Sequence, residues 1–78
     1  MNKRLTKISK YLTFVLRHKP ESIGLVLDGE RWASIEELVT KANNSGKTVT
    51  LAQVEQIVAL NELDIFEVSD DRRQIRAK

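Results

Sequence analysis

Cysteine is absent from this 78-residue sequence, and histidine and proline each occur once. Without cysteine the chain has no disulfide and no thiolate metal site, and a single histidine excludes a zinc site built from several imidazoles. The three glycines are scattered, so there is no glycine-rich phosphate loop. No apolar run approaches the roughly 18 residues of a membrane span, and the N-terminus lacks a signal-peptide core. We therefore expect one cytoplasmic domain with no metal and no membrane contact.

Charge is distributed unevenly along the chain. Residues 1–19 carry six cations and no acid, residues 20–71 carry all eleven acids and three cations, and residues 72–78 carry four cations and no acid. If the fold brings the two ends together, one face would be basic and could attract phosphate. The alternative is that these charges lie on ordinary solvated helix and strand faces.

An amphipathic helix is predicted over residues 3–18. Apolar residues recur there at helical spacing, with Tyr11 and Phe14 expected to widen the apolar stripe. The stripe itself consists of Leu5, Ile8, Leu12, Val15 and Leu16.

The only proline predicts where this helix ends. Pro20 disfavours helical geometry at Lys19, so the helix should end near His18. Arg17 and His18 then lie in the last turn, where the helix dipole favours cations. That preference alone is an adequate structural explanation for these two residues.

Residues 21–33 are predicted to connect this helix to the next. Apolar residues alternate over 23–27 and suggest a short extended segment, and residues 28–30 supply a turn. Trp32 is expected to fill the core at the start of the next helix, with ligand stacking as the alternative.

Two capping boxes mark the starts of two further helices. Ser34 with Glu37, and Thr50 with Gln53, each place a hydroxyl at the N-cap and a Glu or Gln three residues later. The first of these helices should end in residues 43–46, and the second should run to about Glu62.

From residue 65 the apolar period changes to two, which predicts a β-hairpin with a charged tip over 69–73. Helix, short strand, helix, helix and hairpin is the order of a winged helix. We therefore predict an α+β fold, a single monomeric winged-helix domain over residues 1–78. Its expected core contains Trp32, Leu12, Leu38, Ile57 and Phe66.

A winged helix commonly binds duplex DNA through its third helix. Residues 50–62 contain no lysine or arginine, so nothing on that helix would hold a phosphate. The chain also lacks a recognisable nucleophile or acid–base pair. Arg17 and Arg76 suit phosphate because a planar guanidinium forms two parallel hydrogen bonds, and His18 could act as an acid or base.

Several segments resemble the N-terminal lobe of the NAD-dependent RNA 2′-phosphotransferases, which remove the splice-junction 2′-phosphate from transfer RNA. The resemblance extends from Ser9 to Ala77 in order. The segments that carry it are Ser9-Lys10-Tyr11-Leu12, Val15-Leu16-Arg17-His18-Lys19-Pro20-Glu21, Ile23-Gly24-Leu25-Val26-Leu27-Asp28, Trp32-Ala33 and Ile75-Arg76-Ala77.

The resemblance implies a two-lobe transferase whose second lobe, of ADP-ribosyltransferase type, binds NAD. The RNA 2′-phosphate would be transferred to NAD, giving ADP-ribose cyclic phosphate and nicotinamide. Arg17, His18 and Arg76 would then be catalytic, with Arg17, Arg76, Lys19 and Lys10 binding RNA phosphate. NAD would be bound by the C-terminal lobe, which is missing here, so the chain alone is expected to be inactive.

Two departures from the family pattern concern the hairpin. Residues 62–65 lack the basic residues common in relatives, and the turn lacks the usual glycine. The family also continues beyond Ile75-Arg76-Ala77 into a second lobe, whereas this sequence stops at Lys78. The alternative function is a free-standing winged-helix module that binds nucleic acid or protein without catalysis.

Overall fold

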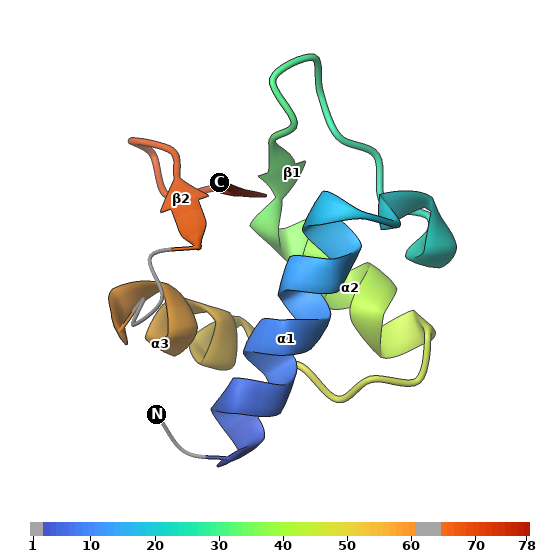
Figure 1. Cartoon of the computed structure of the whole chain (residues 1–78), viewed down its shortest axis with the longest axis vertical. Coiled ribbons are helices and arrows are strands. Elements are labelled where there is room, and N and C mark those ends of the chain that lie inside the picture. The colour runs from blue at the N-terminus through green and yellow to red at the C-terminus, as the bar shows by residue number, and fades with distance from the viewer. Residues whose placement is uncertain (1–2, 61–64) are drawn as a thin grey trace.

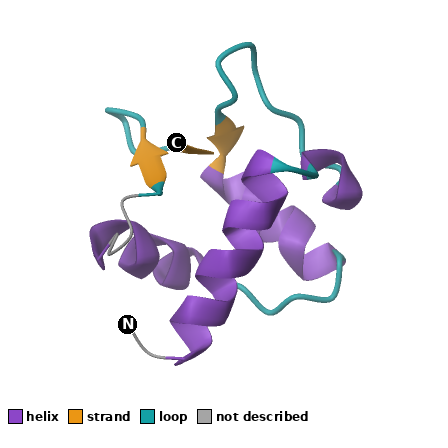
Figure 2. Cartoon of the chain, viewed as in Figure 1, coloured by secondary structure: helices purple, strands orange, loops and turns teal. Residues whose placement is uncertain are grey.

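The computed structural model describes residues 3–60 and 65–78. Within them the chain forms three α-helices, one 3-10 helix and a three-stranded antiparallel sheet, an α+β arrangement (Figures 1 and 2). In chain order the elements are α1 (Lys3–Arg17), η1 (Pro20–Ile23), β1 (Ala33–Ser34), α2 (Ile35–Asn44), α3 (Leu51–Leu60), β2 (Phe66–Val68) and β3 (Gln74–Ala77).

Helix α1 follows the predicted pattern closely. It ends at Arg17, and Pro20 starts the short helix η1 three residues later, as its fixed φ favours. All five residues of the predicted apolar stripe are buried. Phe14 differs from the expectation, because 47% of it is exposed on the outer side of the helix. Tyr11 is only partly buried against the core.

Both predicted capping boxes start helices. The Ser34 hydroxyl accepts a hydrogen bond from the Glu37 backbone N–H at 3.3 Å. Thr50 and Gln53 bond reciprocally, with Gln53 N–H donating to Thr50 Oγ1 at 3.1 Å and Thr50 N–H donating to Gln53 Oε1 at 3.0 Å. These bonds satisfy backbone donors that have no partner within the helix. The expected continuation of α3 to Glu62 lies outside the described residues.

The sheet has the order β1-β3-β2, so the last strand in the sequence is the central one. Strands β2 and β3 form the predicted hairpin, in which Glu67 lies opposite Arg76. The short extended segment predicted at 23–27 forms no strand, and its first two residues belong to the end of η1. Pro20 initiates a helical turn there, and Gly24 ends it with φ +76°, a left-handed conformation that glycine adopts without a Cβ clash. The strand between α1 and α2 is instead β1, which pairs with β3.

The core lies between the three α-helices and one face of the sheet. Of the five residues predicted for it, Leu12, Leu38, Ile57 and Phe66 are buried. Trp32 is not, so that part of the prediction is wrong: its indole is half-buried at the surface beside Arg76. The largest fully buried side chains are Leu12, Leu16, Leu38, Ile57, Ile75, Val15 and Val54. No helix in the described ranges is long and apolar enough to cross a membrane.

Candidate functional site

The C-terminal end of α1 lies against the C-terminal end of β3. Arg17, the last residue of α1, is exposed and donates from Nε to the main-chain oxygen of Lys78 at 3.1 Å, with a second bond from Nη2. The position of Arg17 follows from the helix stop at Pro20, and that of Lys78 from the pairing of β3. Figure 1 shows the end of α1 beside the small sheet. The C-terminal end of α1 therefore meets the C-terminal end of the chain, so one cation of the basic N-terminal stretch lies beside the basic C-terminal stretch.

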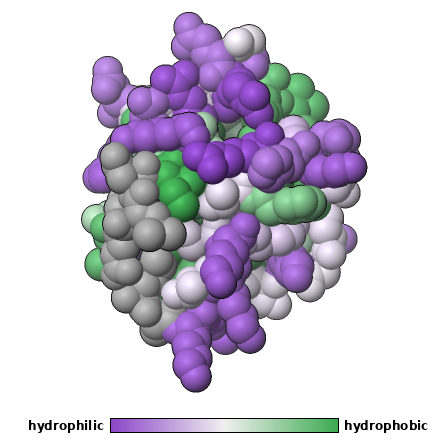
Figure 3. Space-filling model, viewed as in Figure 1, coloured by the Kyte–Doolittle hydropathy of each residue, from purple (hydrophilic) through white to green (hydrophobic). Residues whose placement is uncertain are grey.

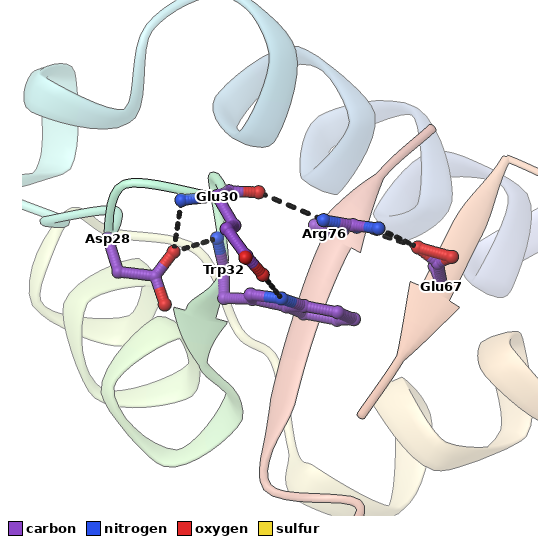
Figure 4. A network of polar contacts seen from close by, with 5 residues as sticks. All are labelled: Asp28, Glu30, Trp32, Glu67 and Arg76. Carbon is purple, nitrogen blue, oxygen red and sulfur yellow. Dashed lines mark hydrogen bonds and ion pairs between the residues drawn. The ribbon is translucent and has the colours of Figure 1, made fainter. Parts of the chain in front are cut away.

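Arg76 on β3 is held by three neighbours (Figure 4). Its Nε and Nη2 both bond Glu67 Oε1 at 2.6 Å, across the hairpin. Its Nη1 donates to the main-chain oxygen of Glu30 at 3.1 Å. The guanidinium also lies over the Trp32 ring, with Cζ 4.3 Å from the ring centroid, a cation–π distance. Arg76 therefore has a defined position before any ligand is bound.

The turn at residues 28–32 supports both arginines. Asp28 Oδ1 accepts hydrogen bonds from the backbone N–H groups of Glu30 at 2.8 Å and Trp32 at 2.9 Å, which confirms the predicted turn. The indole Nε1–H of Trp32 donates to Glu30 Oε2 at 3.3 Å. Together these bonds fix the Trp32 ring under Arg76.

Arg31 connects this turn to α1. Its φ is +71°, a left-handed conformation that is rare for residues other than glycine and costs on the order of 1–3 kcal/mol. The side chain reaches back so that Nη2 donates to the main-chain oxygen of Arg17 at 3.1 Å. The left-handed backbone at Arg31 therefore occurs together with a hydrogen bond that joins the turn to the end of α1.

The other predicted site residues are exposed around the end of α1. The ring of His18 lies 6.1 Å from that of Phe14, centroid to centroid, at a tilt of 39°. Lys19 follows directly, between α1 and η1. Lys10 lies seven residues before Arg17, about two helical turns away and thus on the same side of α1. Lys10 and Arg17 therefore share one side of α1 and Lys19 lies just beyond its end, whereas the printed contacts of Arg76 are with Glu67, Glu30 and Trp32.

An open depression lies between the turn at residues 28–32 and the β2–β3 hairpin. It has a volume of about 330 Å³ and is lined by Glu30, Arg31, Glu67, Arg76, Ala77 and Lys78. The predicted basic face is thus interrupted, because Glu30 and Glu67 lie among the cations. Among the described residues, no group of three or more histidine, aspartate or glutamate side chains could hold a metal ion.

The sequence analysis missed Glu30, Arg31 and Glu67 as part of this site. For Glu67 a signal was present: pairing the apolar residues of the two predicted strands across the hairpin places Glu67 opposite Arg76. For Arg31 there was none, since its contact depends on a backbone conformation that the residue type does not favour.

Comparisons with known proteins identify the family of this chain. Residues 3–78 match the family described as RNA 2′-phosphotransferase, Tpt1 / KptA family, and the chain belongs to that family. This confirms the resemblance noted in the sequence.

Individual relatives carry the same description. The chain is 47% identical over 72 residues to a "Probable RNA 2′-phosphotransferase" of Burkholderia pseudomallei, covering 92% of this chain and 39% of that protein. It is 49% identical over 75 residues to an "RNA 2′-phosphotransferase" of Escherichia coli, covering 96% and 41%. The chain thus spans about two fifths of the length of these curated relatives.

Proposed function

We propose that this chain is the N-terminal, RNA-binding lobe of an RNA 2′-phosphotransferase, which transfers the 2′-phosphate of a transfer-RNA splice junction to NAD. The products would be ADP-ribose cyclic phosphate and nicotinamide. Family membership over residues 3–78 is the observation that carries the proposal. A winged-helix fold class, a cytoplasmic location and a monomeric state belong to the same proposal.

Arg17 is the proposed primary phosphate ligand. Its guanidinium is exposed and bonded to a neutral carbonyl oxygen, that of Lys78. A phosphate oxygen carries charge and therefore accepts stronger hydrogen bonds than a carbonyl. A bound 2′-phosphate would thus replace the carbonyl with little rearrangement of the helix end.

Arg76 is proposed as the second phosphate ligand, but it is not free. Its Nε and Nη2 are paired with Glu67, so phosphate must compete with a carboxylate at 2.6 Å. The support for the proposal is the position of Arg76 on β3, two residues before the Lys78 oxygen that Arg17 contacts.

His18 adjoins Arg17 and is exposed, so substrate can reach it. An imidazole can exchange a proton with a ribose hydroxyl or orient it by a hydrogen bond, and we assign His18 that role in the transesterification. Lys10 and Lys19 are proposed to contact neighbouring backbone phosphates, which attract lysine without regard to sequence.

This chain has no glycine-rich turn of the Rossmann type that binds dinucleotides. Its glycines lie at positions 24, 29 and 46, and none of them belongs to a glycine-rich turn at the start of a helix. We therefore assign NAD to the part of the enzyme present in the longer relatives but outside this chain. The chain by itself is proposed to bind RNA without catalysing transfer.

Nuclear magnetic resonance titration with an RNA oligonucleotide, with and without one internal 2′-phosphate, tests the proposal. Only the phosphorylated RNA should shift the resonances of Arg17, His18 and Arg76 together. Arg17→Gln should abolish the preference for phosphorylated RNA. The matched variant Arg4→Gln, at the other end of α1, should leave that preference unchanged. Equal shifts with both RNAs would mean a general polyanion surface and would overturn the assignment.

One observation favours the alternative, a free-standing module without catalysis. Leu51 and Leu60 on α3 are 45% and 51% exposed. The same helix also contributes to a largely apolar depression lined by Ile35, Val54, Glu55, Val58, Ala59, Val68 and Arg72. Such a surface suits a protein partner, whereas Leu51–Leu60 has no cation for duplex DNA. In the titration above, this alternative predicts no discrimination between the two RNAs.

A further inference from the structure

The outer face of α1 carries a feature that phosphate binding alone does not explain. A helix advances by about 100° per residue, so the side opposite the buried stripe is formed by Lys3, Lys7, Lys10, Phe14, Arg17 and His18. The helix contains no acidic residue. Figure 3, in which α1 lies toward the viewer, shows hydrophilic side chains above and below on this side, with surface of intermediate hydropathy and a smaller hydrophobic area between them.

Phe14 is the unusual member of this face. It is 47% exposed, and in the described part of the chain it is the only aromatic residue among the exposed large hydrophobics. A phenylalanine on a basic helix face contributes little to the core. An exposed aromatic ring surrounded by cations does provide what a nucleic-acid base needs, a flat apolar surface beside groups that bind phosphate.

A second ring extends this surface. His18 lies one turn after Phe14, with ring centroids 6.1 Å apart and planes tilted by 39°. The backbone N–H of His18 donates to the Phe14 carbonyl oxygen at 2.9 Å, which keeps the two residues in register on the helix. Lys10 lies one turn before Phe14, and Arg17 adjoins His18 in the sequence. Both rings are exposed, so a planar group can approach from solvent.

We propose that Phe14 and His18 form a stacking platform for one unpaired RNA base next to the nucleotide that carries the 2′-phosphate. Lys10 and Lys7 would contact backbone phosphates further along α1. The inference rests on the proposed function, because Arg17 fixes where the 2′-phosphate lies. The occupant is single-stranded RNA, since bases in a duplex have no free face to stack on a ring. Helix α1 has no acidic residue, which favours a phosphate backbone as partner over a protein surface of mixed charge.

The platform explains how substrate could be accepted with little regard to base identity. Every base has a face that can stack on an aromatic ring, so stacking orients the strand without reading its sequence. The base next to the 2′-phosphate would be held against Phe14 while the phosphate reaches Arg17. Selectivity would then come from the 2′-phosphate, and orientation from the rings.

A thermodynamic cycle on the full 78-residue chain tests this. Phe14→Leu keeps an apolar side chain without a ring, Phe14→Trp keeps a ring, and Val26→Ala changes another exposed hydrophobic residue, 73% exposed, outside α1. The probe is a single-stranded RNA with one internal 2′-phosphate, together with versions carrying an abasic nucleotide at each flanking position in turn. Affinity is measured by fluorescence anisotropy.

Phe14→Leu should weaken binding about tenfold, whereas Phe14→Trp should stay within about twofold of the unmodified chain and Val26→Ala should have no effect. For the unmodified chain, one abasic position beside the 2′-phosphate should cost a similar factor. In Phe14→Leu the same abasic change should cost nothing further. A 2-aminopurine at that position should lose fluorescence when it binds the unmodified chain, a measurement that needs no variant.

The proposal is overturned if Phe14→Leu binds the RNA as tightly as the unmodified chain. It is also overturned if, at every abasic position, the loss of affinity from Phe14→Leu and the loss from the abasic nucleotide combine as independent factors. Failure of the proposed function has a different signature. It would appear as equal affinity for RNA with and without the 2′-phosphate, because stacking strengthens both complexes alike and does not change their ratio.

Discussion

Arg17 and Lys78 lie 61 positions apart, yet the Arg17 guanidinium donates two hydrogen bonds to the Lys78 main-chain oxygen. This contact joins the end of the first helix to the end of the last strand. The proposed phosphate site therefore combines two segments that are distant in the sequence, and neither segment could form it alone. The site therefore depends on the tertiary fold.

The Glu67–Arg76 pair leads to the first prediction. Glu67→Gln removes the carboxylate that competes with phosphate for Arg76 and should raise the affinity for 2′-phosphorylated RNA about threefold, the scale of one partly exposed ion pair. Glu55→Gln, an exposed site on α3 with the same change in charge, is the control. Titration calorimetry measures both. Equal effects of the two variants would show that Arg76 only holds the hairpin to the turn at 28–32.

The second prediction concerns the core. Leu12→Ala should lower the free energy of unfolding by about 2–5 kcal/mol, because Leu12 is fully buried and the lost atoms leave a cavity. Val26→Ala removes atoms from an exposed residue and should change it by less than about 0.5 kcal/mol. Urea denaturation followed by circular dichroism compares them. Similar stability of the two variants would contradict the packing described here.

Asp71 at the hairpin tip gives a third prediction. Its Oδ1 accepts hydrogen bonds from Ser69 Oγ at 2.6 Å and the Arg73 N–H at 3.0 Å. Ser69 first, and then Arg73, lower the pKa of the Asp71 carboxyl below its ordinary value of 3.8. Because the folded-state pKa is the lower one, the stabilisation is complete above the unfolded value and is lost as the pH falls through the folded value.

Carbon-13 resonance titration of Asp71 should therefore give a midpoint below 3.8. Ser69→Ala removes the larger of these hydrogen-bond contributions and should move the midpoint up toward the ordinary value. A midpoint that is unchanged by Ser69→Ala would show that this hydrogen bond does not control the titration.

A fourth prediction concerns NAD. The chain alone should show no RNA 2′-phosphotransferase activity and should bind NAD more weakly than about 0.1 mM, a dissociation constant that corresponds to roughly 5.5 kcal/mol. Isothermal titration calorimetry measures the affinity, and release of nicotinamide measures the activity. Tighter binding would place NAD contacts within residues 1–78 and contradict the assignment of NAD to the rest of the enzyme.

The helices were predictable because their signals are local. The apolar stripe of α1, the stop at Pro20 and the hydroxyls of Ser34 and Thr50 each act within a few residues. The hairpin was predictable for a similar reason, since apolar residues alternate with polar ones within each strand and the turn between the strands is short. Strand β1 was missed because two residues cannot show a period, and only the pairing with β3 makes them a strand.

The position of the candidate site in the fold could be predicted in part, but the contacts within it could not. Arg17 and His18 follow from the helix stop, and α1 does lie against β3. The ion pair with Glu67 and the ring of Trp32 under Arg76 depend on tertiary contacts that apolar periodicity does not report. The exposure of Phe14 was missed because hydrophobicity alone does not say whether a residue near the edge of the stripe is covered.

Strand β3 is the central strand of the sheet and the last to be synthesised. Until residues 74–77 have left the ribosome, neither β1 nor β2 has the neighbour it pairs with in the described structure. The helices can form early, because their hydrogen bonds are local, whereas the sheet must wait for the end of this segment. The Arg17 contact with Lys78 would form later still, so the site is assembled only after this entire stretch of chain has been translated.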